Sequence, residues 1–385
     1  MHLFKLIYRN TFRHKQRTWL TILGVTIAIL AFGILRTLVN AWYAGVEASS
    51  SVRLITRNSI SLVFPLPLSY KEKIQRIPGV ENVSYAVWFN GTYISEKNFI
   101  PNFAIEPESF LEIYPEYVLP DDQKAAFFRD RGAVIAGRKV AERFDWKIGD
   151  TIPLIGTIYP GTWNFTLRGI YHGAEKNTDE TQFFFHWNYL NESLKKSLPN
   201  RADQVGIYIE KIADPDLAPR VSEAIDETFK NSLAETLTET EKSFQLSFIS
   251  MTEAIVVVIQ LVSFMVIIII MAVVANTMVM TARERIGEYA IMKTLGFGGW
   301  HLSVLIFGES LLITTIGCVF GVALTFPSAK IFREHIGTYF PVFTISLNTM
   351  LLSLAASTLV GIMAAVAPAW HATRIRIAEG LRRIG

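Results

Sequence analysis

The chain has 385 residues, 50% of them hydrophobic, and a mean hydropathy of +0.30. Together with its long apolar runs, this composition is typical of a membrane protein and excludes a wholly soluble one. The net charge of +3 is too small to indicate a nucleic-acid partner, and none is expected. The single cysteine, Cys318, excludes a disulfide within the chain.

The sequence lacks the motifs of the common nucleotide-hydrolysing and metal-dependent enzymes. It contains no GxxxxGK[ST] phosphate loop, no CxxC pair and no HExxH motif. The histidines show no metal-ligand spacing, and the carboxylates show no pattern that predicts acid–base catalysis. We therefore expect no catalytic site, no metal site and no cofactor bound directly by this chain.

The first 18 residues predict an amphipathic helix on a membrane surface. They contain basic residues and no acidic ones, and Leu3, Ile7 and Phe12 fall on one helical face. A signal-peptide start is the alternative, but no small-residue cleavage site follows the apolar run. Residues 19–43 predict the first transmembrane helix, which ends near the aromatic pair Trp42 and Tyr43.

Residues 44–232 predict a soluble α+β domain, because turns, prolines and mixed charges replace the apolar runs. The turn pair of Asn90 and Gly91 between two β-rich stretches predicts a hairpin. Residues 233–253 predict a helical stalk that leads into the next apolar run. Strands are expected at 132–135, 151–155, 164–170 and 204–210, and helices at 138–144 and 217–229.

Three further transmembrane helices are predicted at 254–280, 301–326 and 345–370. A modest loop at 327–344 joins the last two, and a basic tail at 371–385 ends the sequence.

The side of the membrane on which each loop lies follows from charge. The three basic segments, 1–18, 281–300 and 371–385, all fall on one side of four spans. The positive-inside rule makes that side cytoplasmic. The large domain and the 327–344 loop are then expected on the outer side.

Residues 281–300 form a short charged segment between two spans. Lys293 near the end of its helix and Gly296 after it are typical of a helix C-terminus. A helix this short and polar is not stable alone, so it either binds a partner or lies among lipid headgroups. We expect a partner groove to pair Glu284 and Glu288, with Ile286, Ala290 and Met292 as apolar anchors. The candidate contact residues are Arg283, Glu284, Arg285, Ile286, Gly287, Glu288, Tyr289, Ala290, Met292, Lys293 and Gly296.

Two further features lie inside the predicted span at 301–326. An acid such as Glu309 is costly in a membrane helix, and by default it marks a functional site. The alternative, which we favour, is a polar contact between helices or a group that reaches the membrane interface. Gly317 and Gly321 form a GxxxG pair that allows close helix packing, although chance matches are common in apolar helices.

The order of one span, a large domain and three further spans resembles the permeases of the MacB, FtsX and LolC–LolE class of ABC transporters. The resemblance covers both ends and all four spans, and it is weakest at 95–130 and 171–203. Two stretches of the large domain, IAGRKVAERFDWKIGDTIPL and FTLRGIY, are similar to the outer domain of this class. The other matching stretches are RNTFRHKQRTWLTILGVTIAI, RERIGEYAIMKTLGF, FGESLLITTIGCVFGVAL and APAWHATRIRIAEGLRRIG.

The resemblance implies an α-helical membrane protein with four transmembrane helices and a large α+β periplasmic domain between helices 1 and 2. It implies that 281–300 is a coupling helix for a cytoplasmic ABC ATPase, and that Glu309 has a structural polar role shared by the class. MacB carries a fused N-terminal ATPase, whereas the residues before Trp19 leave no room for one. ATP and magnesium are therefore expected in a separate partner subunit.

The resemblance also implies a multi-pass protein of the bacterial inner membrane that works, among membrane lipids, as a dimer with a second permease, identical or not. The coupling helix would transmit ATPase closure to the outer domains, a mechanotransmission that drives efflux or export from the periplasm or outer leaflet. A periplasmic adaptor and an outer-membrane channel would be further partners.

Other functions stay open at this point. Within the class, the alternatives are LolC- or LolE-like lipoprotein release and FtsX-like regulation of a periplasmic partner. Outside the class, a membrane-anchored sensor would need a cytoplasmic output domain, and the inside segments are short. An enzyme with an outer active site would need a catalytic constellation, which the sequence does not show.

Overall fold

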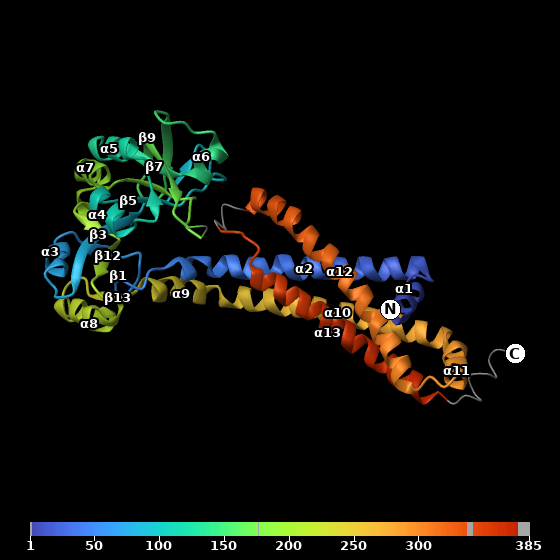
Figure 1. Cartoon of the computed structure of the whole chain (residues 1–385). Coiled ribbons are helices and arrows are strands. Elements are labelled where there is room, and N and C mark those ends of the chain that lie inside the picture. Colours follow the sequence, from blue (N-terminus) through green and yellow to red (C-terminus); the bar gives the residue numbers. More distant parts are fainter. Residues whose placement is uncertain (1, 176, 337–341, 376–385) are drawn as a thin grey trace. The chain divides into compact units, whose positions relative to one another are not determined.

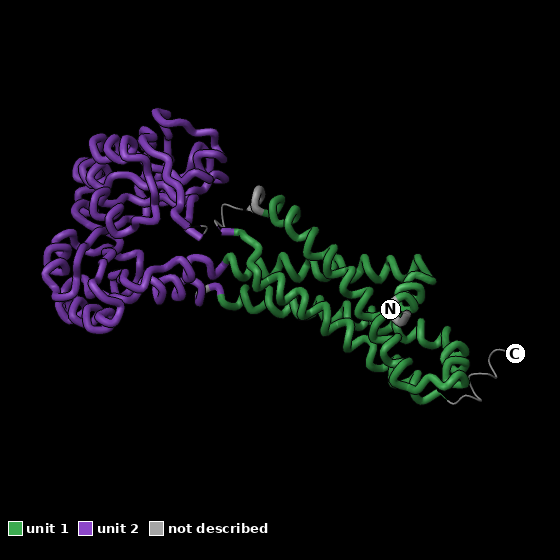
Figure 2. The backbone as a smooth tube through the Cα atoms, in the orientation of Figure 1, with its two compact units in different colours: residues 1–41, 253–336, 343–385 green, residues 42–252, 337–342 purple. Residues whose placement is uncertain are grey.

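The computed structural model describes residues 2–175, 177–336 and 342–375. These residues fall into two compact units, a helical unit (residues 1–41, 253–336 and 343–385) and an α/β domain (residues 42–252, with 337–342), coloured separately in Figure 2. Together they confirm the predicted fold class of four apolar helices and a mixed α and β domain.

The helical unit contains the candidate membrane spans. Within the described chain, four helices are long and apolar enough to cross a membrane. They are α2 (Lys15–Ala48), α10 (Glu253–Glu284), α12 (Gly299–Ile336) and α13 (Leu347–Arg374), and the shorter helices are α1 (His2–Thr11) and α11 (Ile286–Thr294) (Figure 1).

The long helices pack through small and β-branched residues. Helix α13 packs against α12 and α10, and α12 packs against α2. The buried apolar side chains of this core include Ile22, Val25, Ile29 and Phe32 of α2, Ile267, Ile270 and Val274 of α10, Ile313 of α12, and Val360 and Ala364 of α13. Many other apolar side chains of α10 are exposed, as expected where a helix faces lipid or another subunit.

Helix α12 is longer than predicted and continues through Pro327 to Ile336. The prediction of a loop at 327–344 was wrong in its first part, which is helical although proline usually ends or kinks a helix. Proline is tolerated inside membrane helices, where neighbouring groups satisfy the backbone that it frees. Residues 337–341 of the expected loop, residues 376–385 of the expected tail, and Met1 lie outside the described residues.

The α/β domain is built on one mixed sheet. Among the described residues, eleven strands join this sheet, ten of them in the order β13-β1-β12-β3-β5-β10-β7-β9-β8-β4, with β6 paired to β9. The pairs β5–β10 and β7–β9 are parallel and the others are antiparallel.

The strands of this sheet are β1 (Arg53–Asn58), β3 (Val80–Trp88), β4 (Gly91–Tyr93), β5 (Asn102–Ile105), β6 (Tyr117–Val118), β7 (Ala133–Gly137), β8 (Thr151–Gly156), β9 (Gly161–Gly173), β10 (Phe183–His186), β12 (Ile207–Ile212) and β13 (Thr236–Thr240). A separate pair is formed by β2 (Leu66–Pro67) and β11 (Gln204–Val205).

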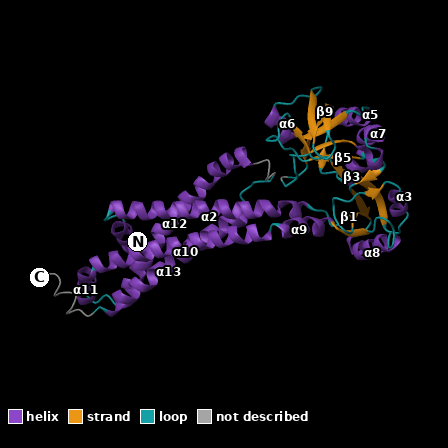
Figure 3. Ribbon diagram, turned by 180° about the vertical axis from the view of Figure 1, so that it is seen from behind, coloured by secondary structure: helices purple, strands orange, loops and turns teal. Residues whose placement is uncertain are grey.

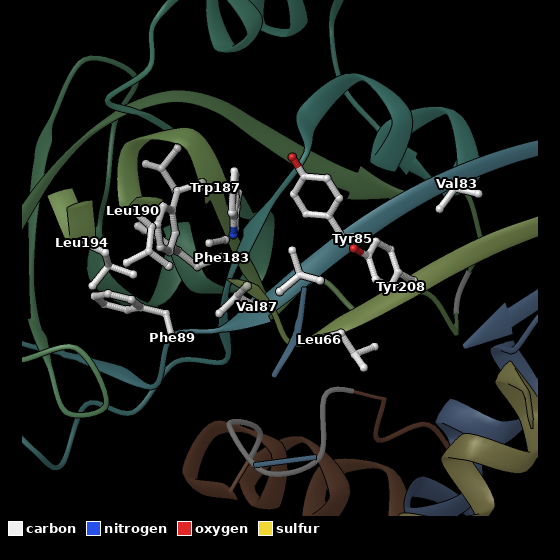
Figure 4. Packing of buried hydrophobic residues seen from close by; sticks show 14 of the residues in the cluster. Leu66, Val83, Tyr85, Val87, Phe89, Phe183, Trp187, Leu190, Leu194 and Tyr208 are labelled. Atoms are coloured by element: carbon white, nitrogen blue, oxygen red, sulfur yellow. The ribbon is translucent and has the colours of Figure 1, made fainter. Parts of the chain in front are cut away.

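Helices cover both faces of the sheet. Alternate residues of each strand point to opposite faces, so each strand contributes side chains to two cores. Phe183 and Phe185 of β10 enter one core, and Phe184 between them enters the other. The first core, shown in Figure 4, packs against α3, α6, α7 and α8, and the second against α4 and α5. Strands and helices are distinguished by colour in Figure 3. The helices are α3 (Tyr70–Gln75), α4 (Pro107–Ile113), α5 (Asp121–Arg129), α6 (Arg138–Phe144), α7 (Trp187–Ser197), α8 (Ala218–Thr228) and α9 (Glu241–Met251), with short 3₁₀ turns at Pro199–Arg201 and Pro215–Leu217.

The predicted hairpin around Asn90 does not form. Asn90 does turn the chain in the left-handed region, with φ of 54°. However, β3 pairs with β12 and β5, whereas β4 pairs with β8. The side chain of Asn102 bonds both backbone groups of Gly91, at 2.8 Å and 2.7 Å, and so takes the place of a hairpin partner.

The predicted helical stalk at 233–253 is part strand and part helix. Residues Thr236–Thr240 form β13, which pairs with β1, and the helix begins only at Glu241. The alternating threonines of this stretch favour an extended strand over a helix.

Candidate functional site

The candidate site lies where α10 ends and α11 begins, at one end of the helical unit (Figure 1). Helix α10 ends at Glu284, and Arg285 follows with φ of −106° and ψ of 16° before α11 begins. We use the name charged elbow for six residues that meet here: Arg13, Arg17, Glu284, Arg285, Glu288 and Glu309.

A buried ion pair forms the centre of the charged elbow. Arg285 donates from Nη1 to Glu309 Oε1 of α12 at 2.6 Å, and from Nε to Glu288 Oε2 at 3.0 Å. Arg285 and Glu309 are only 5% and 3% exposed. Removing one partner of such a pair leaves an unpaired buried charge, at a cost of about 3–5 kcal/mol. The structure therefore places Glu309 in a polar contact between helices, the alternative favoured from the sequence.

Two outer ion pairs join the charged elbow to the N-terminal segment. Arg17 in the first turn of α2 binds Glu284 at 2.8 Å, and Arg13 in the turn before α2 binds Glu288. Burial would raise the pKa of Glu288, but hydrogen bonds from Arg285 and Arg13 outweigh it and lower that pKa. Glu284 and Glu288, which we expected to face a partner groove, thus pair with arginines of their own chain.

Lys293 fixes the far end of α11. Its ammonium donates to the carbonyl oxygens of Thr373 and Ile375 at 2.8 Å and 2.9 Å, at the C-terminal end of α13. Gly296 follows with φ of 90°, as the predicted helix stop requires. Helix α11 is therefore held at both ends by side chains that reach other helices.

The apolar face of α11 points the other way from the prediction. Ala290 and Tyr289 are buried against α12 and α13, and Ile286 and Met292 are half-buried, so these residues do not form an exposed set of anchors. Three exposed apolar side chains at and just after the end of α11 are Ile291, Leu295 and Phe297, at 45%, 72% and 42% exposure, and we call them the apolar tip.

Sequence reasoning missed the apolar tip. The spacing of four residues between Ile291 and Leu295 puts both on one face of a helix, and this signal could have found them. Of the remaining candidates, Arg283 is exposed and Gly287 is half-buried.

The predicted glycine pair packs as the spacing indicates. A Cβ atom on Gly317 would lie 2.6 Å from Val25 Cγ1, and one on Gly321 would lie 2.7 Å from Ile29 Cβ. Both glycines therefore allow α12 to approach α2 closely.

The N-terminal helix is also packed on the helical unit. Ile7 of α1 is buried, and its side chain lies against Gly308 of α12. This contact adds a packing surface of the protein to the predicted location on a membrane surface, which stays a prediction. It places the basic residues that follow α1 beside the charged elbow.

Comparisons with known proteins cover both units. A model of the MacB-like periplasmic core domain matches residues 18–228, which is more than half of the chain. A model of the C-terminal region of FtsX-like permeases matches residues 260–377. No curated protein matches the chain.

Solved structures similar to the α/β domain are matched at low identity. The periplasmic region of MacB from Actinobacillus actinomycetemcomitans matches 53% of this chain and 95% of its own, with 9% identity and a TM-score of 0.39. The extracellular domain of the ABC-type transporter YknZ from Gram-positive bacteria matches 49% and 100%, with 11% identity and a TM-score of 0.35. A domain of a permease protein from Porphyromonas gingivalis matches 49% and 90%, with 15% identity and a TM-score of 0.35.

Proposed function

Because the chain belongs to the family of MacB-like and FtsX-like ABC permeases, which are multi-pass transport components, we propose that it couples a separate ATPase to motion of its α/β domain. The ATPase would bind ATP and magnesium on the cytoplasmic side. Motion of the α/β domain in the periplasm would drive export of a substrate from the periplasm or the outer leaflet. A second permease copy would complete the complex in the bacterial inner membrane, and an adaptor and an outer-membrane channel would extend it.

One observation carries this proposal, the combination of a fixed charged elbow and an exposed apolar tip. A helix of nine residues such as α11 is not stable alone in water. Here the charged elbow and the Lys293 contacts tie its two ends to the N-terminal segment, α12 and α13. A force on the apolar tip would therefore reach several membrane helices together.

The cytoplasmic position that we propose for the charged elbow is supported by charge. The N-terminal segment and 281–300 are basic, and basic loops favour the cytoplasm. The apolar tip is then available to a cytoplasmic ATPase, where leucine and phenylalanine side chains can enter an apolar groove.

The test is copurification of the full chain with an ATPase that contains a phosphate loop. Leu295→Glu and Phe297→Glu would each place a charge in that contact, and binding should weaken about tenfold or more. Leu233→Glu is the matched control, because Leu233 is fully exposed on the α/β domain.

Two outcomes would contradict the proposal. If the unaltered chain binds no such ATPase, the transport function is wrong. If the two tip variants retain the ATPase as well as the control does, the apolar tip is not the contact. Lipoprotein release and regulation of a periplasmic partner share the same coupling step, so the test holds for them too.

A further inference from the structure

The chain enters and leaves the α/β domain through two neighbouring strands. Strand β1 follows α2, and β13 leads into α9, and the two strands pair antiparallel with Leu54 opposite Thr240. The last turns of α2 and helix α9 also touch, since Trp42 donates from Nε1 to Thr252 Oγ1 at 3.0 Å. Both connecting helices are therefore rooted at the same edge of the sheet.

Glu241 uses both carboxylate oxygens at this root. Its Oε2 accepts hydrogen bonds from the backbone nitrogen of Ser50 at 2.7 Å and from Arg53 Nε at 2.8 Å. Its Oε1 accepts from the hydroxyl of Tyr114 at 3.1 Å. Glu241 is the first residue of α9 and is only 6% exposed. The Glu241 carboxylate thus joins α9 to Ser50, just after α2, and to Tyr114, just after α4.

Arg53 completes the contact from the strand side. Its guanidinium binds Glu241, both oxygens of Glu116 at 2.7 Å and 3.1 Å, and the carbonyl of Ile113 at 3.2 Å. It also lies over the ring of Tyr114, 4.2 Å from its centroid. Arginine is suited to this role, because its planar fork can bind two carboxylates in fixed geometry.

Apolar packing contributes little at the root of α9. Among the described side chains of this helix, only Glu241 and Ile249 are buried, and Phe244 is half-buried. Ile249 lies two turns further along the helix, away from the sheet. The direction in which α9 leaves the sheet is therefore set mainly by polar contacts. These are the contacts of Glu241 and the hydrogen bonds that Glu239 accepts from Ser243 and Ser247 at 3.0 Å and 3.5 Å.

We propose that Arg53 and Glu241 form a clamp that positions α9 on the sheet, so that a displacement of either connecting helix moves the α/β domain as one body. This role deepens the proposed function and rests on it, because the clamp matters for transport only if the helices carry force to the domain. The clamp itself is a property of the α/β domain, and it can be measured without transport.

Glu241→Gln is the informative variant. It keeps the shape of the side chain, and Arg53 keeps Glu116 as its counter-charge, so the domain has the best chance of folding. Glu180→Gln is the matched control, because Glu180 is 7% exposed and likewise accepts from an arginine, Arg138 at 2.9 Å, and from a backbone nitrogen, that of Gly173 at 2.9 Å. The two variants each remove one buried carboxylate from the α/β domain, but only Glu241→Gln breaks the clamp.

The first measurement is the distance distribution between spin labels on α9 and on α8, a helix that packs on the sheet. Labels would be placed at the exposed residues Ser250 of α9 and Glu223 of α8, in the full chain with Cys318 replaced by Ser. We expect Glu241→Gln to broaden the distribution, with the clamped population falling about tenfold relative to the unclamped one, because a buried charge-assisted hydrogen bond is lost. Glu180→Gln should match the unaltered protein. Equal distributions in all three proteins would overturn the clamp.

The second measurement is transport per ATP hydrolysed in the complete complex. We expect Glu241→Gln to hydrolyse ATP normally but to move less substrate for each ATP, a change that a simple loss of folded protein would not produce. Normal transport per ATP in a variant whose label distances broaden would also overturn the role. If the unaltered complex shows no ATP-driven transport, the proposed function fails, and the label distances alone decide the clamp. Should Glu241→Gln not fold, Tyr114→Phe, which removes only one hydroxyl bonded to Glu241, takes its place in both measurements.

Discussion

Glu210 of β12 should make the α/β domain less stable as the pH rises. Its side chain is fully buried, and neither carboxylate oxygen accepts a hydrogen bond of normal geometry from the described residues. Burial raises the pKa of Glu210 from its ordinary value of 4.5 to about 8. The nearby hydroxyl of Thr56 opposes this increase in part, and the charge of Asp226 adds to it.

The sign and size of the effect follow from these two pKa values. Between them the carboxyl group is protonated in the folded protein and ionised in the unfolded chain, so a rise in pH favours unfolding. The stability is fully present below about pH 4.5, and it is lost progressively until about pH 8. One pKa unit corresponds to about 1.4 kcal/mol, so the complete loss is a few kcal/mol, about 5 at most.

Glu210→Gln removes the titration and keeps the shape of the side chain. We expect the variant to gain in unfolding temperature relative to the unaltered protein as the pH is raised from about 5 to 8.5. The assay is thermal unfolding of the full chain in detergent, followed by tryptophan fluorescence, to which the buried Trp146, Trp163 and Trp187 of the α/β domain contribute. Glu223→Gln, at an exposed position of α8, controls for the loss of one carboxylate. The reasoning is refuted if the difference in unfolding temperature between Glu210→Gln and the unaltered protein does not change with pH.

Three further predictions concern the helical unit and its surroundings. Single cysteines at Gly298 and Lys97, in a chain with Cys318 replaced, should react with an impermeant reagent from opposite sides of the membrane; reaction from one side would contradict the topology. The purified chain should hydrolyse no ATP, because its sequence lacks a phosphate loop, and steady turnover without any partner would contradict this. Gly321→Val should lower the yield of folded protein, because even a Cβ atom there lies 2.7 Å from Ile29 Cβ, whereas Gly298→Ala should not. Equal yields of the two variants, measured by size-exclusion chromatography in detergent, would show that α2 and α12 can separate at no cost.

Local patterns in the sequence were enough to predict some of the elements but not their partners. Helix Arg138–Phe144 is found where its pattern predicted it, because apolar spacing and flanking glycine are local signals. The turn at Asn90 is also present, yet β4 pairs with β8, some sixty residues further along the chain. Strand pairing of this kind depends on contacts that no local pattern contains.

The same limit applies to the charged elbow. The sequence identifies its charged residues and makes Glu309 conspicuous, because an acid in an apolar run is rare. It does not show that Arg13 and Arg17, more than 260 positions away, would pair with Glu288 and Glu284. The faces of α11 were misjudged for a related reason, since a nine-residue helix with apolar residues on several sides gives no clear direction of burial.

The two connections between the helical unit and the α/β domain differ in how they can carry twist. Helix α2 runs without a break for 34 residues, about 51 Å, whereas the hydrocarbon core of a bilayer is about 30 Å thick. The return path is interrupted at Thr252, where α9 ends and α10 begins. A continuous helix transmits rotation about its axis as well as thrust along it, and an interrupted one loses much of the rotation. Because Arg17 binds the charged elbow in the first turn of α2, a torque applied there acts on the start of a continuous helix of 34 residues.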